Sequence, residues 1–252
     1  MPFKSDGVEV IAVDDQEDIL ELTKLFLERF EEDLEVETTT DPEKVLEDVE
    51  EGLYDAVLSD YDMPRITGLD LLEEVREIDE DLPFILYTGK GSEEIAADAV
   101  NHGVTDYFRK EAGSDHYQMI AKSLTDAVDK YRNAKEREVF EAIVDNSENP
   151  ILITDPESEI LYVNPALLEV TGYDSEELLG ENLSKITPGE SYAALYEASE
   201  DAKVLEAQDV RGLKKNGDSY SQDQQIIPIK GKDGWPEFYA SISDLLEPSE
   251  TE

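Results

Sequence analysis

The first half of the chain alternates short apolar runs with amphipathic segments, and this alternation constrains the fold more than any other feature. The runs VEVIAV (8–13), LEVETTT (34–40), YDAVLSD (54–60), LPFILYTG (82–89) and DYFRK (106–110) have the length of strands. The segments between them, such as DILELTKLFLERF (18–30), repeat apolar residues every three or four positions, as helices do. Five such strand–helix repeats predict a (βα)5, doubly wound α/β domain with a parallel sheet covered on both faces.

A long helical pattern follows over residues 114–145. Spacings of three and four positions predominate among its apolar residues, which are Tyr117, Ile120, Leu124, Val128, Tyr131, Val139 and Ile143. The polar segment NAKERE (133–138) interrupts this stripe, and Pro150 disfavours helix at the residue before it. A continuous helix of about 30 residues would span about 45 Å, and two helices joined by a polar hinge are the alternative.

After Pro150 the pattern becomes that of an α+β domain. PILITD (150–155) and ILYVN (160–164) read as strands, whereas YAALYEASEDAKVLEA (192–207) reads as a helix. Three further strand-like segments join at KKNGD (214–218) and GKDG (231–234), which favour hairpin turns, so we expect a five-stranded antiparallel sheet. The predicted parts are a first domain at 1–130, a helical connector at 131–146, and a second domain with a short acidic tail at 147–252.

Composition narrows the classes of partner and site. With 64 acidic and 21 basic residues the formal charge is −43, which disfavours direct binding to nucleic acid or to anionic membranes. This balance resembles that of halophilic, haloarchaeal-type proteins, and an ordinary acidic protein is the alternative. The chain has no cysteine, which excludes disulfides and thiol catalysis. No apolar run approaches the roughly 20 residues of a membrane span, so we expect a cytoplasmic protein.

Polar side chains stand where the predicted parallel strands end. Asp14 and Asp15 follow the first strand, Asp60 follows the third, Thr88 ends the fourth and Lys110 ends the fifth. These ends meet at one edge of the sheet, and clustered carboxylates offer the hard oxygen ligands that suit Mg²⁺. An Asp60 oxygen could then attack phosphorus, with Lys110 neutralising charge and Thr88 donating a hydrogen bond. The alternative is that these acidic residues are ordinary solvent-exposed surface charges and form no site, because acidic pairs are common throughout this chain.

These residues resemble the receiver domain of two-component response regulators over roughly 8–128. The matching residues are Asp14, Asp15, Asp60, the loop DMPRITG (62–68), Thr88 with Gly89, Tyr107 and Lys110. The resemblance implies that Asp60 is the phosphoacceptor for a sensor histidine kinase and that Asp15 and Asp60 bind Mg²⁺ directly. It also implies that Asp14 acts through water, that Asp62 offers its backbone carbonyl, and that Thr88 and Tyr107 form the switch.

Two rival readings use the same residues differently. DYD (60–62) after an apolar strand also resembles haloacid-dehalogenase-type phosphatases, with Asp60 as nucleophile and Asp62 as acid/base. That family places its acidic pair after the lysine, whereas here the pair precedes Asp60. The other rival is a receiver fold kept only for docking. We expect no enzyme activity beyond weak self-dephosphorylation.

The second half resembles a PAS domain over roughly 140–246. The resemblance rests on Asp155, on Asn164 with Pro165, and on the TGY (171–173) and EELLG (176–180) segments. An interaction module and a small-molecule sensor both remain possible, although the absence of cysteine excludes flavin-adduct chemistry. His102 and His116 precede the domain, so haem is not expected, and Trp235 and Tyr239 are expected to pack. The chain therefore reads as a response regulator that switches interactions through its connector and PAS domain. A homodimer through the connector helix or the PAS domain is one form that this switch can take.

Overall fold

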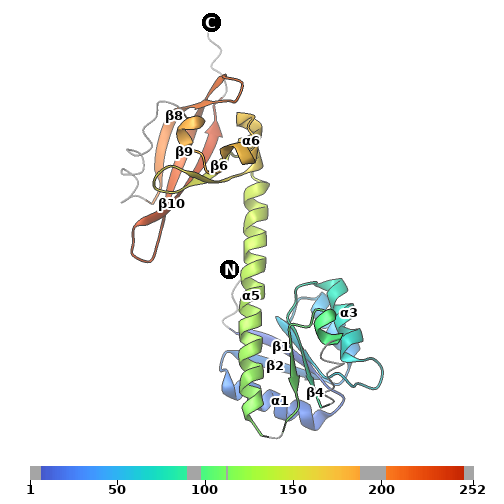
Figure 1. Ribbon diagram of the computed structural model, residues 1–252. Helices are drawn as coiled ribbons and strands as arrows, with labels where there is room; N and C mark the ends of the chain where they lie inside the picture. The colour runs from blue at the N-terminus through green and yellow to red at the C-terminus, as the bar shows by residue number, and fades with distance from the viewer. Residues whose placement is uncertain (1–6, 90–97, 112, 188–202, 247–252) are drawn as a thin grey trace. The chain divides into compact units, whose positions relative to one another are not determined.

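The computed structural model describes residues 7–89, 98–111, 113–187 and 203–246 (Figure 1). The chain divides into two compact units, Met1–Arg137 and Glu138–Glu252. Each unit has its own sheet and its own hydrophobic core.

The first unit is built on a five-stranded parallel sheet with the strand order β2-β1-β3-β4-β5. Its strands are β1 (Val8–Val13), β2 (Leu34–Thr39), β3 (Ala56–Ser59), β4 (Phe84–Thr88) and β5 (Asp106–Arg109). The helices between them include α1 (Glu17–Phe30), α2 (Pro42–Glu50) and α3 (Gly68–Ile78). The predicted (βα)5 fold class is confirmed. Between β4 and β5, residues 98–101 are helical, whereas residues 90–97 lie outside the described residues.

Helices α1 and α5 (Asp115–Asp145) cover one face of this sheet, and α2 and α3 cover the other (Figure 1). The first face buries Leu20 and Leu27 of α1 against Ile120 and Leu124 of α5. The second buries a separate cluster that includes Val45 of α2. Because neighbouring side chains of a strand point to opposite faces, both layers draw on the same strands.

Helix α5 is continuous from Asp115 to Asp145, so the polar segment at 133–138 does not interrupt it. The Arg132 guanidinium contacts the Asp55 carboxylate at 2.6 and 3.0 Å, and its Nη2 also donates to the carbonyl of Gly7 at 2.8 Å. The Tyr131 hydroxyl donates to Asp79 at 2.7 Å. These contacts hold the middle of α5 against the first unit.

The second unit is a five-stranded antiparallel sheet with the order β7-β6-β10-β9-β8, which confirms the predicted α+β architecture. Its elements are β6 (Ile151–Thr154), β7 (Ile160–Val163), α6 (Pro165–Thr171), α7 (Ser175–Leu178), η1 (Leu183–Lys185), β8 (Leu205–Leu213), β9 (Ser219–Lys230) and β10 (Pro236–Leu245). Buried Asn164 joins β6 to α6, because its Oδ1 accepts from the backbone of Ile151 at 2.8 Å and of Leu167 at 3.1 Å.

Two predictions for this unit are wrong. Residues 205–207, predicted as the end of a helix, belong to β8, because Leu205 pairs with Ile226 and Ala207 with Gln224 of β9. The rest of that predicted helix lies mainly in 188–202, outside the described residues. Trp235 does not pack into the core, since 64% of it is exposed, whereas Tyr239 is buried as expected. None of the described helices could cross a membrane.

Candidate functional site

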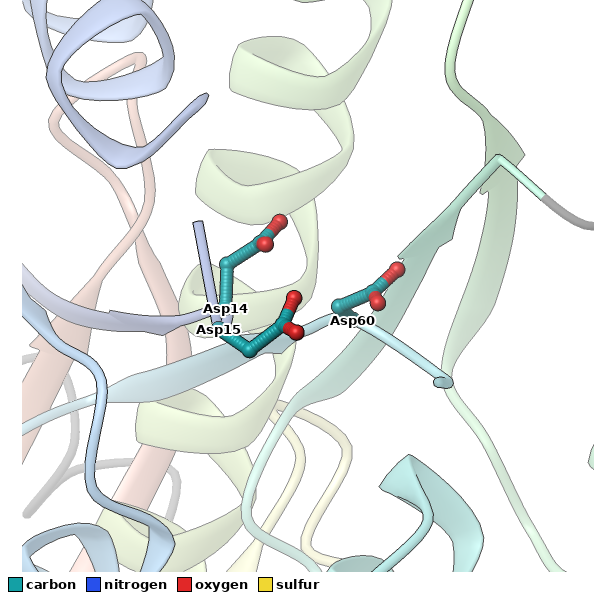
Figure 2. Close-up of side chains that lie close together, drawn as sticks. All are labelled: Asp14, Asp15 and Asp60. Atoms are coloured by element: carbon teal, nitrogen blue, oxygen red, sulfur yellow. The ribbon is translucent and has the colours of Figure 1, made fainter. Parts of the chain in front are cut away.

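The carboxyl edge of the parallel sheet brings together the side chains predicted to converge there. Asp14 and Asp15 follow β1, and Asp60 follows β3. Each of the three offers a carboxylate oxygen within 4.8 Å of the others. Figure 2 shows the three carboxylates gathered where these strands end. Asp14 and Asp60 are buried and Asp15 is exposed, so the cluster opens to solvent on one side.

Lys110 supplies the positive charge that faces this cluster. Its Nζ donates to Asp14 Oδ2 at 2.5 Å and to Asp60 Oδ1 at 2.9 Å. Burial disfavours the charged ammonium, but the hydrogen bonds to the two carboxylates outweigh it and raise the pKa of Lys110. Burial raises the pKa of Asp14, and the contact with Lys110 opposes that rise. Lys110 is therefore held as a cation between two buried acids.

Backbone groups fix the direction of the Asp60 carboxylate. The N–H of Asp62 donates to Asp60 Oδ2 at 3.1 Å, while Lys110 occupies the other oxygen. The backbone N–H of Asp60 donates to the carbonyl of Val13 at 2.8 Å, which ties the end of β3 to the end of β1. The contact from the Asp62 N–H was not predicted. The sequence signal that could have found it is the tendency of aspartate to accept from the backbone two residues ahead.

Gly68 allows the loop after Asp60 to close tightly. Its N–H donates to the carbonyl of Tyr61 at 2.8 Å. A Cβ at this position would lie 2.3 Å from the carbonyl oxygen of Asp60 and 2.8 Å from a methyl group of Leu86. The loop then enters α3 through a capping box, in which Thr67 and Asp70 each bond the backbone of the other. The predicted loop at 62–68 is therefore built around a position where only glycine fits.

The remaining predicted residues lie on β4 and β5. Thr88 is fully buried at the end of β4, and its carbonyl accepts from the backbone N–H of Lys110 at 2.9 Å. Tyr107 is half-buried on β5, beside the core cluster of α2 and α3, and burial raises its pKa. Asp62 contacts Asp60 through its backbone, and its carboxylate is not in the group formed by Asp14, Asp15 and Asp60. The roles assigned to Thr88, Tyr107 and Asp62 stay predictions.

Two family models match this chain, one to each unit. The response regulator receiver domain matches residues 10–122, and the PAS domain matches residues 148–244. The chain carries a receiver domain followed by a PAS domain. The resemblances to a receiver domain and to a PAS domain are thereby confirmed, and the carboxylate cluster belongs to the receiver domain.

Several curated proteins are similar to parts of the chain. Human "High affinity cAMP-specific and IBMX-insensitive 3',5'-cyclic phosphodiesterase 8A" is 36% identical over 108 residues, 41% of this chain and 13% of that protein. "Two-component response regulator ARR10" of Arabidopsis thaliana is 35% identical over 106 residues, 41% of this chain and 19% of that protein. "Sensor histidine kinase TmoS" of Ectopseudomonas mendocina is 24% identical over 282 residues, 98% of this chain and 27% of that protein. The chain thus spans only 13% to 27% of the length of these relatives.

Proposed function

We propose that this chain is a response regulator whose Asp60 accepts a phosphoryl group from a histidine kinase. One observation carries the proposal: Asp60 is oriented by Lys110 and by the Asp62 N–H beside two further carboxylates. The receiver family and the similarity to a response regulator and to a sensor histidine kinase support the same class.

The carboxylate cluster fits Mg²⁺ by its donor chemistry. Three ionised carboxylates and one ammonium give a formal charge of 1 − 3 = −2 within a small volume. Hard, anionic oxygen donors of this kind suit a hard dication. We propose that Asp15 and Asp60 would hold the metal directly, that Asp14 would act through water, and that Asp62 would contribute its backbone carbonyl. When bound, Mg²⁺ would supply positive charge next to the phosphoryl oxygens.

The side chains of the receiver domain can perform the transfer in one displacement. An oxygen of the Asp60 carboxylate attacks phosphorus of the donor phosphohistidine, and the new P–O bond forms as the P–N bond breaks. The imidazole of the kinase keeps the electron pair of the broken bond. Lys110, already paired with Asp60, pairs with a phosphoryl oxygen as negative charge moves onto Asp60, and the Thr88 hydroxyl donates to another.

The output of this reaction is a change in interactions rather than a chemical product. We propose that phosphorylation shifts a pre-existing equilibrium, with Thr88 and Tyr107 as the switch, and that α5 carries the change to the PAS domain. A homodimer through α5 or the PAS domain is a further part of this proposal. A net charge of −43 supports protein partners over nucleic acid, because the phosphates of nucleic acid would be repelled. We also propose a cytoplasmic location.

The deciding experiment is incubation with Mg²⁺ and a small phosphodonor at high salt, followed by intact mass. We expect one acid-labile phosphoryl group per chain, and Asp60→Asn should abolish it. The matched control Asp62→Asn, two residues away, should still gain the group, with an altered rate of decay. Sustained turnover of phosphate esters would favour the phosphatase instead, and absence of both labelling and Mg²⁺ binding would favour a docking module.

A further inference from the structure

The last two residues of β4 face opposite layers of the receiver domain. Ile85 and Tyr87 pack in the cluster that α1 and α5 cover, whereas Leu86 packs in the cluster of α2 and α3. By the same alternation Thr88 faces the α2 and α3 layer, where Tyr107 also packs. A change passed from Thr88 to Tyr107 would therefore act within the α2 and α3 layer, against which Tyr131 of α5 also packs. Tyr87 instead lies in the α1 and α5 layer, next to the first turn of α5.

Tyr87 is joined to the first turn of α5 by a buried hydrogen bond. Its hydroxyl lies 2.7 Å from Nε2 of His116, and the two residues are only 4% and 5% exposed. The His116 ring lies 4.1 Å from the ring of Tyr117, which in turn stacks at 5.0 Å on Phe26 of α1. Because leaving a buried polar group without its partner is costly, this pair should move together.

The other side of Tyr87 contacts the Asp60 site. The Nζ of Lys110 lies 5.6 Å from the centre of the Tyr87 ring, within the range of a cation–π contact. Tyr87 also lines a cavity of about 10 Å³ together with Asp14, Ser59 and Asp60. Burial, Tyr117 and the negative charge of Asp14 all raise the pKa of the Tyr87 hydroxyl, so the phenol stays neutral. One ammonium thus contacts Asp14, Asp60 and Tyr87 at once.

We propose that Tyr87 and His116 form a second coupling route, which carries the state of Asp60 to the first turn of α5. The route rests on the proposed phosphorylation of Asp60. A phosphoryl group on Asp60 draws the Lys110 ammonium toward its oxygens, which changes the charge next to the Tyr87 ring. The Tyr87 ring shifts in response, and the hydrogen bond from its hydroxyl shifts His116 with it. The route acts on the α1 and α5 layer, separately from Thr88 and Tyr107.

The test compares wild type with the double variant Tyr87→Phe/His116→Phe. Replacing both polar partners by apolar rings of similar shape should leave stability nearly unchanged. Intact mass reports phosphoryl incorporation, and hydrogen exchange reports the amides of residues 116–121 before and after phosphorylation. In wild type we expect those amides to change their exchange rate about fivefold, as expected for the gain or loss of one hydrogen bond. In the double variant that change should vanish, while peptides containing Tyr107 still respond.

The matched control is Tyr131→Phe, which removes a different tyrosine hydrogen bond of α5, the one to Asp79. This control should keep the full response of residues 116–121, because Asp79 lies on the α3 side and not at the Asp60 site. Phosphoryl incorporation with an unchanged α5 response in the double variant would overturn the coupling route alone. Absence of incorporation in wild type would overturn the proposed function and the route with it.

Discussion

Substitution of Gly68 by alanine tests whether the loop after Asp60 holds the phosphoacceptor in place. The added methyl carbon would lie 2.3 Å from the Asp60 carbonyl oxygen, 2.8 Å from Leu86 Cδ2 and 3.1 Å from Tyr61 Cα. Favourable separations between such atoms are about 3.5 Å, so the backbone must move by roughly 1 Å. Two of the three clashes involve backbone atoms, which cannot swing aside as the end of a side chain can.

Gly68→Ala should lower both the stability and the rate of phosphoryl incorporation. Forcing an extra methyl group into a packed site costs about 1–3 kcal/mol of unfolding free energy, and because the clash is with backbone atoms we expect about 3 kcal/mol for Gly68→Ala. A displacement of about 1 Å at a reacting group can slow a reaction about 100-fold. We therefore expect phosphoryl incorporation at Asp60 to fall by about two orders of magnitude, even under conditions where the variant is folded.

Denaturant unfolding at high salt measures the stability, and a mass time course with Mg²⁺ and a small phosphodonor measures the incorporation. The matched control is Gly52→Ala, where φ is +67° but an added Cβ would meet nothing within 4 Å. That change should cost about 1 kcal/mol through backbone strain and leave incorporation unchanged.

Wild-type incorporation by Gly68→Ala, together with a stability within about 0.5 kcal/mol of wild type, would refute the reasoning. The loop would then yield to a methyl group without moving Asp60. A loss of stability with normal incorporation would show that the strain is relieved on the α3 side of the loop.

Three further predictions concern single polar side chains. Burial disfavours the charged form of Asp79, but the hydrogen bond from Tyr131 and the other contacts of the carboxylate lower the pKa of Asp79 from 3.8. Loss of this hydrogen bond in Tyr131→Phe should therefore cost about 1 kcal/mol of unfolding free energy at pH 7. That difference should shrink as the pH falls from 3.8 through the lowered folded-state pKa, in denaturant titrations at each pH. Asn164→Ala removes four hydrogen bonds and should cost the PAS domain about 3 kcal/mol by calorimetry. Asn164→Asp keeps the oxygen that accepts from Ile151 and Leu167, but it turns a second oxygen toward two backbone carbonyls and buries a charge, so it should cost at least as much. Burial lowers the pKa of His116 from 6.5, so as the pH falls the imidazole is protonated in the unfolded state before it is protonated in the folded state. The free energy of unfolding should therefore fall by up to about 1.4 kcal/mol per pH unit below pH 6.5. His116→Gln should flatten that slope.

The strands of the receiver domain could be predicted because their signal is local. A parallel strand that is buried on both faces must be almost continuously apolar, and β3 and β4 are buried at every position. The residue that follows such a strand is then placed at one edge of the sheet. Asp14, Asp15, Asp60 and Lys110 could therefore be assigned to one site before any distance was known.

Predictions failed where pairing or exposure decided the outcome. Residues 205–207 carry alanine, leucine and glutamate, which favour helix, but hydrogen bonding to β9 makes them a strand. Trp235 follows the GKDG turn directly, and this position keeps it in solvent despite its large apolar surface. Intrinsic preference gave the wrong answer at both places because the neighbours of these residues come from distant parts of the chain or from the turn itself.

The sequence by itself determined the two fold classes and the edge of the sheet where the acidic residues meet, because strand length, helical period and strand ends are properties of consecutive residues. Only the tertiary structure decided what each group touches. Lys110 stands between Asp14 and Asp60, which are 96 and 50 positions away, and Tyr87 bonds His116, which is 29 positions away. Contacts of this kind depend on strand register and on helix packing, so they exist only once the sheet and its two helical layers have assembled.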